Sequence, residues 1–298
     1  MSAPSETHLV PPDTLPTRLS EYALGKFLGL PSRNAVKKAI RRGEVQVDGQ
    51  PGQTSTWVQP GQRVSWHPSA SVPPKPYHMA LRFPFCDEHV AIVWKPAGLV
   101  VRGNQFRTLE NALVHNLSAS SATDALPWPQ PVHRLDAATR GLVMVARSER
   151  AKVRLSQLLA ERQVVKRYLA LVMGLAPDAG HWRSPIGGQP AASRFERLDA
   201  VRSLRNDWLS LLALWPHTGR THQLRIHAAE AGHAILGDPL YSPPEATMQH
   251  KGLFLAAVGL RLPHPVQPDQ KIVVAEALPH KFRQRLVREA RMWARAHG

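Results

Sequence analysis

The sequence lacks the features that mark secreted, membrane-spanning and cofactor-binding proteins. Its 298 residues include one cysteine, Cys86, so no disulfide can form within the chain, and we expect a reducing, cytoplasmic location. No run of about 18 apolar residues is present, and residues 1–16 have no apolar centre of the kind found in signal peptides, which argues against a membrane protein. The glycine-rich dinucleotide, Walker A and Gly-x-Ser-x-Gly motifs are absent, so nucleotide-cofactor and serine-hydrolase chemistry have no support.

Acidic residues are scarce relative to basic ones. Lysine and arginine together number 38 against 22 aspartates and glutamates, and the formal net charge is +16. Such an excess favours a polyanionic partner, with nucleic acid ahead of an anionic membrane surface. Hydrophobic residues make up 43% of the chain, enough for a sizeable core, and the length suggests one large domain plus a smaller one.

The first part of the chain indicates a small α/β domain over residues 17–68. Residues 1–16 contain four prolines and few large apolar side chains, and we expect a flexible tail there. Residues 18–28 have a helical pattern, and a second helix is expected from Ser32, a favourable N-cap, to residue 42. Residues 44–49 then alternate and turn like a strand that enters a hairpin.

One side of this second helix is strongly basic. Its apolar residues share a face, which leaves the cations on the other face. Those cations are Arg33, Lys37, Lys38, Arg41 and Arg42. A charge run is usually a solvated face, but here it is a candidate contact for RNA phosphates.

The remainder of the chain indicates a larger α+β domain. Residues 69–79 form a Pro-rich linker, and residues 80–298 mix strand-like and helical segments. The expected strands are Val90–Trp94, Leu142–Ala146, Tyr168–Met173 and Leu209–Leu214, and the expected helices are Arg150–Glu161, Ala228–Ala231 and Lys281–Ala296. Because strands and helices do not alternate strictly, we expect a mixed, mostly antiparallel sheet. The last helix either extends an RNA-binding surface or closes the core with solvated arginines.

The most informative segment is residues 133–142, with the sequence HRLDAATRGL. It places the carboxylate of Asp136 among arginines and a histidine, and the segment then turns at Gly141 before an apolar run. Nearby cations favour the ionised form of a carboxylate, which suits a nucleophile better than a general acid. Taken alone, such a pattern is more often a structural salt bridge at the start of a buried strand.

Four further segments accompany this motif along the chain. They are WKPAGLVV at residues 94–101, QVVKRYLALV at 163–172, HTGRTHQLRIH at 217–227 and GDPLY at 237–241. In the third of these, polar Gln223, Arg225 and His227 alternate with Leu224 and Ile226. That alternation predicts a strand with Arg225 on the face opposite the apolar pair.

Together the five segments resemble the motifs of the RluA-type RNA pseudouridine synthases, in which an aspartate attacks the target uridine. The resemblance implies that Asp136 is this nucleophile, that Tyr168 packs against the target base and that Arg225 pairs with Asp136. It also implies that Arg134 displaces or replaces a nucleotide that leaves its stack. Arg140 departs from the commonest family pattern, which has serine there.

The resemblance carries several further implications. The larger domain should have the pseudouridine synthase fold, and the enzyme should act as a monomer on rRNA or tRNA without a cofactor. Residues 17–68 resemble the S4-type RNA-binding domain that often precedes this catalytic domain, which makes the basic second helix an RNA-binding candidate.

Two other functions compete with this one. A noncatalytic RNA-binding or assembly protein with the same fold would have no physical need for Asp136, Tyr168 and Arg225 together. A metal-dependent RNA hydrolase would need ligands, and the histidines are the candidates: His217, His222, His227 and His233. Their spacings match neither a helix face nor a His-x-x-x-His motif, so no metal site is expected.

Overall fold

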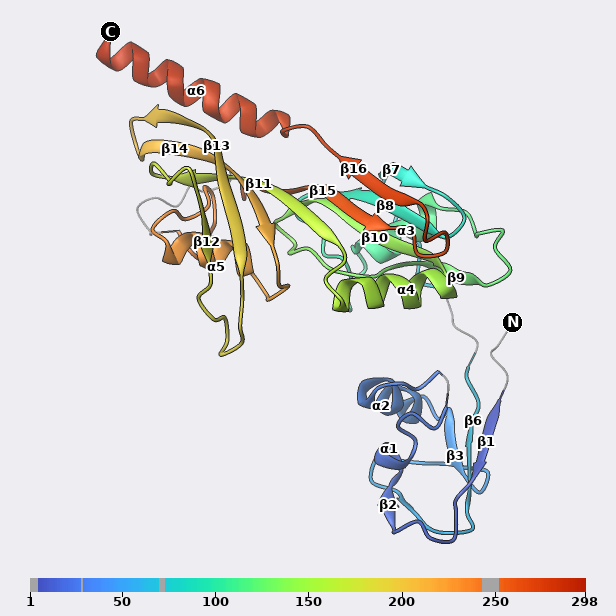
Figure 1. Cartoon of the computed structure of the whole chain (residues 1–298). Coiled ribbons are helices and arrows are strands. Elements are labelled where there is room, and N and C mark those ends of the chain that lie inside the picture. The colour runs from blue at the N-terminus through green and yellow to red at the C-terminus, as the bar shows by residue number, and fades with distance from the viewer. Residues whose placement is uncertain (1–4, 28, 70–72, 243–251) are drawn as a thin grey trace. The chain divides into compact units, whose positions relative to one another are not determined.

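The computed structural model describes residues 5–27, 29–69, 73–242 and 252–298, and the chain divides into two compact units, residues 1–72 and 73–298 (Figure 1). Residues 1–4 of the predicted tail and 70–72 of the predicted linker lie outside the described residues. The smaller unit has a hydrophobic core of its own, built from residues between Val10 and Trp66. No helix in the described ranges is long and apolar enough to cross a bilayer.

The N-terminal unit combines short strands with two helices. Its elements are β1 (Glu6–Leu9), β2 (Thr17–Arg18), α1 (Leu19–Tyr22), α2 (Arg33–Arg41), β3 (Val45–Val47), β4 (Gln50–Pro51), β5 (Trp57–Val58) and β6 (Arg63–Trp66). Four strands form a sheet in the order β1-β6-β3-β4, and β2 pairs with β5. The predicted hairpin after the second helix is confirmed, with Asp48 and Gly49 both at positive φ in the turn.

Helix α2 is confirmed with the predicted cap and faces. The Ser32 hydroxyl accepts a hydrogen bond from the Ala35 N–H at 3.3 Å, and Val36, Ala39 and Ile40 are buried. The five basic residues of this segment are exposed. The apolar stripe therefore holds the helix in the unit and leaves its cations in solvent.

Two predictions for this unit are wrong. Glu6–Leu9 is not part of a flexible tail, because it pairs antiparallel with β6 as β1 and leads into the buried Val10. The first helix ends at Tyr22 instead of extending through residues 18–28, because Gly25 adopts φ +69° in a turn. Hydrogen bonding to a distant strand and a left-handed turn leave little trace in local periodicity.

The C-terminal unit is built on one large sheet. Its strands are β7 (Arg82–Cys86), β8 (Val90–Lys95), β9 (Ala125–Pro131), β10 (Arg140–Ser148), β11 (Val165–Met173), β12 (Ala179–Trp182), β13 (Ser193–Ser203), β14 (Asp207–Pro216), β15 (Leu255–Pro263) and β16 (Lys271–Ala275). Its helices are α3 (Leu109–Asn116), α4 (Glu149–Ala160), α5 (Gln223–Glu230) and α6 (His280–His297).

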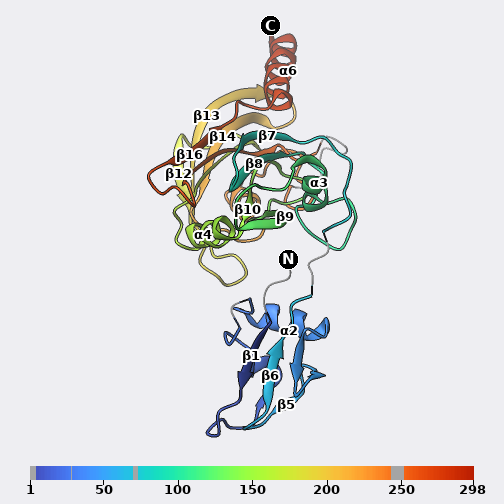
Figure 2. The same ribbon diagram turned by 90° about the vertical axis from the view of Figure 1, so that its right-hand side faces the viewer.

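The sheet is mixed and mostly antiparallel, as predicted. Its main path runs β12-β13-β14-β11-β15-β10-β8-β7, with β16 beside β15 and β9 beside β10 (Figures 1 and 2). The described pairings are antiparallel except for β10 with β15, which is parallel. At that contact Gly141 has φ +129°, and a Cβ there would lie 2.2 Å from the Ala257 carbonyl oxygen. Only glycine fits this approach.

The two faces of the central strands pack against different helices. Leu169 and Leu171 of β11 share a cluster with Phe282 and Leu286 of α6. The alternate residues Ala170 and Val172 pack with Leu224 and Ala228 of α5 on the opposite face. The four strands predicted from the sequence and the helix over residues 150–161 are confirmed.

The predicted strand around Arg225 is wrong, because residues 223–230 form helix α5. Polar and apolar residues alternate in this segment because helix α5 buries polar side chains as well as apolar ones. Gln223 donates to the Ala192 carbonyl, Arg225 binds Asp238, and His227 bonds with Ser193 and the Ser184 carbonyl. A helix whose polar residues are buried with partners shows no amphipathic stripe.

Candidate active site

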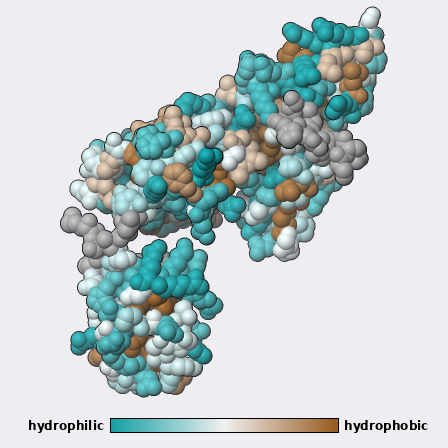
Figure 3. Space-filling view, turned by 180° about the vertical axis from the view of Figure 1, so that it is seen from behind, coloured by the Kyte–Doolittle hydropathy of each residue, from teal (hydrophilic) through white to brown (hydrophobic). Residues whose placement is uncertain are grey.

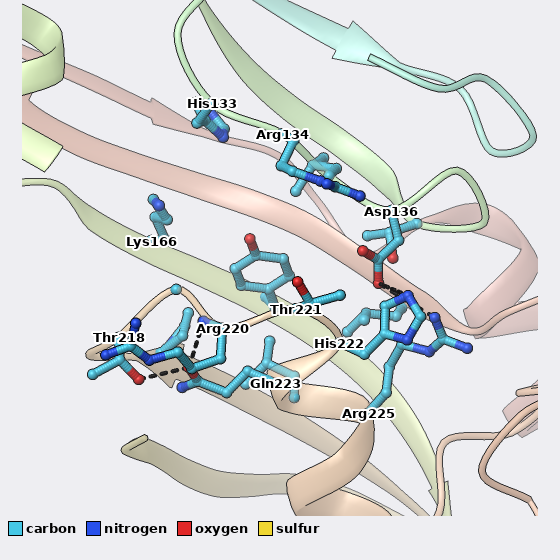
Figure 4. Close-up of a pocket in the computed structure, with 17 residues that line it drawn as sticks. His133, Arg134, Asp136, Lys166, Thr218, Arg220, Thr221, His222, Gln223 and Arg225 are labelled. Carbon is cyan, nitrogen blue, oxygen red and sulfur yellow. Dashed lines mark hydrogen bonds and ion pairs between the residues drawn. The ribbon is translucent and has the colours of Figure 1, made fainter. Parts of the chain in front are cut away.

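A cavity of about 260 Å³ lies where three chain segments of the larger unit meet (Figure 4). The loop before β10, the beginning of β11 and the segment that leads into α5 each contribute side chains. The cavity brings together the three residues predicted as catalytic, Asp136, Tyr168 and Arg225. Two of these residues, Asp136 and Arg225, are 89 positions apart in the chain.

Asp136 sits in a tight turn that its own backbone closes. Its carbonyl accepts a hydrogen bond from the Thr139 N–H at 3.0 Å, two residues before the close approach at Gly141. The carboxylate is 18% exposed, and its Oδ2 lies 3.3 Å from Nη1 of Arg225 and 3.7 Å from Nε2 of His222. One edge of the carboxylate is therefore held by the protein while part of the group reaches the cavity.

Arg225 is itself fixed by a second carboxylate. Its Nε and Nη2 each donate to Asp238 at 2.7 Å, a bidentate pair in which the aspartate is fully buried and the arginine 4% exposed. Burial lowers the pKa of Arg225, but the ion pairs with Asp238 and Asp136 raise it more, so the net shift is upward. The permanently charged guanidinium thus links a structural carboxylate to the one in the cavity.

Lys95 places a further cation behind the loop that carries Asp136. Its ammonium is completely buried and donates to the carbonyls of Pro96, Leu99 and Ala137 at 2.9, 2.7 and 3.2 Å. Burial lowers its pKa to about 8, an effect that the charge of Asp136 opposes. The ammonium therefore ties the turn at residues 96–99 to the Asp136 loop.

Tyr168 and His133 line the same cavity in neutral forms. Burial, together with the nearby charge of Asp136, raises the pKa of the Tyr168 phenol well above its usual range. Burial lowers the pKa of His133 to about 3, and its Nε2 accepts a hydrogen bond from the Met144 N–H at 2.9 Å. His133 is therefore an acceptor that ties the loop before β10 to the middle of that strand, and Tyr168 offers an aromatic ring with a neutral, protonated hydroxyl.

The predicted RNA-binding residues fall into two sets. Arg134 lines the cavity, is exposed, and lies beside Asp136 (Figure 4). Of the other five, Arg33, Lys37, Lys38 and Arg41 lie on α2 of the N-terminal unit, and Arg42 is the C-cap of that helix.

Sequence reasoning assigned no role to three residues that the structure places at the site. His222 adopts a left-handed conformation with φ 56°, and its Nδ1 lies 2.9 Å from the Tyr241 hydroxyl. Asp238 and Lys95 lie in the two motif segments GDPLY and WKPAGLVV. The presence of ionisable residues in those segments was the available signal.

Three of the four histidines named as candidate metal ligands have side-chain partners within the protein. His222 faces Asp136 and Tyr241, His227 bonds with Ser193, and His233 bonds with the Met173 carbonyl. Within the described ranges, no group of three or more His, Cys, Asp or Glu side chains is placed to hold a metal ion.

Comparison with known proteins identifies the family to which this fold belongs. A sequence model described as RNA pseudouridylate synthase matches residues 89–230. The structure of human RNA Pseudouridylate Synthase Domain Containing 1 shares the fold, with a TM-score of 0.56, 24% identity, and coverage of 67% of this chain and 84% of that one. A protein of Aquifex aeolicus named uncharacterized RNA pseudouridine synthase is 32% identical, over 88% of this chain and 92% of its own length.

A relative from Nitrosomonas europaea, named ribosomal large subunit pseudouridine synthase D, is 31% identical over 86% of this chain and 80% of its own length. The chain therefore belongs to the RluA-type RNA pseudouridine synthase family, and it is an isomerase that acts on RNA. The noncatalytic alternative gains no support from these relatives.

Proposed function

We propose that this enzyme converts specific uridines of structured rRNA or tRNA to pseudouridine with the Asp136 carboxylate as nucleophile. The observation that carries the proposal is the placement of this partly exposed carboxylate in a cavity, held by an arginine that is itself fixed by Asp238. The names of the relatives, which include a large-subunit rRNA enzyme, support rRNA as the first substrate to test. Because the residues that line the cavity come from one chain, we propose a monomer. The single cysteine of the chain supports a reducing, cytoplasmic location.

The reaction requires a bond exchange without any redox change. The N1–C1′ bond of the uridine breaks, the detached uracil turns, and a C5–C1′ bond forms. The hydrogen on C5 leaves as a proton, and N1 gains one, so atoms balance without a cofactor. After the N1–C1′ bond breaks and before the C5–C1′ bond forms, an ionised carboxylate can bond to C1′ in place of the base. A cavity around the site keeps the detached uracil within reach of C1′.

The target nucleotide must leave its base stack to reach the cavity. Arg134 at the cavity rim is suited to fill the vacated position, because a guanidinium can stack and bond a phosphate at once. The neutral ring of Tyr168 then offers a face for the uracil. The most direct functional assay uses rRNA transcript that carries tritium at C5 of uridine, because each turnover releases one tritium to water.

Substitutions of Tyr168 separate ring packing from hydroxyl chemistry. We expect Tyr168→Phe to keep most of the turnover and Tyr168→Ala to lose much more. The raised pKa of the phenol keeps its hydroxyl protonated, so the ring contributes by packing and not by transferring a proton. Tritium release by the two purified variants is the measurement. If Tyr168→Phe is as inactive as Tyr168→Ala, the hydroxyl takes part in the chemistry.

The N-terminal unit is proposed as an S4-like RNA-binding domain. Its support is the exposed basic face of α2, presented by a unit with a separate core. A triple variant in which Arg33, Lys37 and Arg41 are replaced by glutamine should bind RNA more weakly, and its affinity should depend less on salt. The slope of log affinity against log salt should fall by about 0.7–0.9 for each lost phosphate contact.

This slope can be compared for the full chain, the triple variant and a protein truncated to residues 73–298. The truncated unit should fold, because the hydrophobic cluster of residues 10–66 is separate from the clusters of the larger unit. An unchanged slope in the triple variant would identify the α2 cations as a solvated face. In that case the charge used for RNA binding lies in the larger unit.

A further inference from the structure

A second cavity adjoins the one that holds Asp136. It has a volume of about 690 Å³ and lies where α4 and β14 end and β11 begins. Five residues line both cavities: Lys166, Pro216, Thr218, Gly219 and Arg220. We call this second cavity the basic groove, because its lining includes five cations and no acid. The cations are Arg162, Lys166, Arg194, Arg220 and Arg261.

Lys166 stands at the junction of the two cavities without an anion. It is half-buried, and among the described residues its ammonium has no hydrogen-bond or ion-pair partner. Burial lowers its pKa, which shows that the surroundings disfavour the charged form. A cation in such a place costs free energy unless an anion accompanies it, so the site is poised for an anionic ligand.

The other end of the groove presents two more cations. Arg162 follows α4 with φ 58°, and Arg261 stands opposite Val165 in the β11–β15 ladder. Both are exposed, and within the described part of the chain neither has an acidic partner. Arg194 and Arg220 are already engaged. Arg194 lies over the Trp215 ring at 3.8 Å and pairs with Glu196 at 3.8 Å, and Arg220 donates to the Pro190 carbonyl at 3.1 Å.

We propose that the basic groove binds the phosphodiester backbone of the substrate RNA beside the nucleotide held in the Asp136 cavity. Lys166 contacts the phosphate of that nucleotide, and Arg162 and Arg261 contact phosphates further along the strand. The assignment rests on the proposed function for the identity of the nucleotide. The groove itself follows from its continuity with the cavity and from a lining of cations without acids.

Binding measurements test the groove independently of catalysis. The probe is a fluorescein-labelled RNA hairpin with a uridine loop, and its affinity is followed by anisotropy over a series of KCl concentrations. We expect the Arg162→Gln/Arg261→Gln variant of the full chain to bind more weakly, with a salt slope lower by about 1.4, because each single-strand phosphate contact contributes about 0.7.

The control removes the same charge elsewhere in the same unit. Arg288 and Arg291 are exposed on α6, which packs on the face of the sheet opposite α5. Hydrophilic side chains predominate on α6, seen at the upper right of Figure 3. Arg288→Gln/Arg291→Gln should leave the slope unchanged. Equal losses in the groove and control variants would overturn the proposal, since they would reflect net charge alone.

Lys166 is tested by turnover of the tritiated rRNA transcript. We expect Lys166→Met to raise KM about tenfold or more and to change kcat less than about threefold, because a charge-assisted phosphate contact is lost while the side-chain volume is kept. Lys166→Arg should restore KM. A variant with wild-type KM would overturn the assignment of Lys166, as would a loss that arginine does not rescue. If the wild-type enzyme releases no tritium, the proposed function fails, and the salt slopes still decide the groove.

Discussion

Asp136→Asn is expected to abolish pseudouridine formation while the protein folds and binds RNA normally. The substitution keeps the shape of the side chain and removes the charge needed at C1′, so turnover should fall by on the order of 10⁴-fold or more. Arg225 keeps both hydrogen bonds to Asp238, so no buried cation loses its only partner. We therefore expect an unchanged melting temperature and RNA affinity within a few-fold of wild type.

Asp199→Asn is the matched control for this variant. Asp199 is exposed on β13 and does not line the cavity, so its substitution should leave tritium release unchanged. Substantial turnover by Asp136→Asn, measured with the same transcript, would mean that the nucleophile has been assigned to the wrong residue.

Arg225→Met is expected to cost both activity and stability. The substitution leaves the fully buried Asp238 without its bidentate partner, and breaking a buried pair from one side typically costs about 3–5 kcal/mol of unfolding free energy. It also leaves the Asp136 carboxylate without the guanidinium that orients it. Denaturant unfolding measures the first effect, and tritium release at a temperature where the variant is folded measures the second.

A double variant separates the two contributions. Arg225→Met/Asp238→Asn removes the unpaired buried charge and should recover part of the lost stability, while activity stays lost. Arg285→Met is the control, because Arg285 pairs with the buried Glu289 at 2.6 Å on α6, away from the cavity. It should destabilise the protein without inactivating the folded enzyme. Recovery of turnover by the double variant would reduce Arg225 to a structural role.

Four of the ten described strands of the large sheet, β8, β10, β11 and β14, could be predicted because they contain continuous apolar runs. Leu142–Ala146 is completely buried, so hydrophobicity alone identifies that strand. The strand predicted around Arg225 is wrong because residues 223–230 form a helix whose polar side chains are buried with partners, and such a helix has no amphipathic pattern in its sequence. Strand β1 could not be predicted because its pairing partner, β6, lies more than fifty residues away in the chain.

The candidate site likewise combines residues that local motifs identify with contacts that only the folded chain creates. Asp136 and Arg225 could be named from local motifs, but the Asp238 pair that fixes Arg225 depends on how the chain turns back after α5. His222 likewise lies close to Asp136 because its backbone adopts a left-handed conformation, which its local sequence does not predict. The basic groove joins residues from α4, β13 and β15, so it exists only in the folded chain.

The central claim is that Asp136 of this chain makes pseudouridine in cellular RNA. The most direct test maps pseudouridines by carbodiimide-blocked primer extension in rRNA and tRNA from cells that lack the gene, complemented with wild type or with Asp136→Asn. We expect one or more stops that disappear with the gene, return with wild type, and stay absent with Asp136→Asn. Stops that persist without the gene, or that return with Asp136→Asn, would contradict the account.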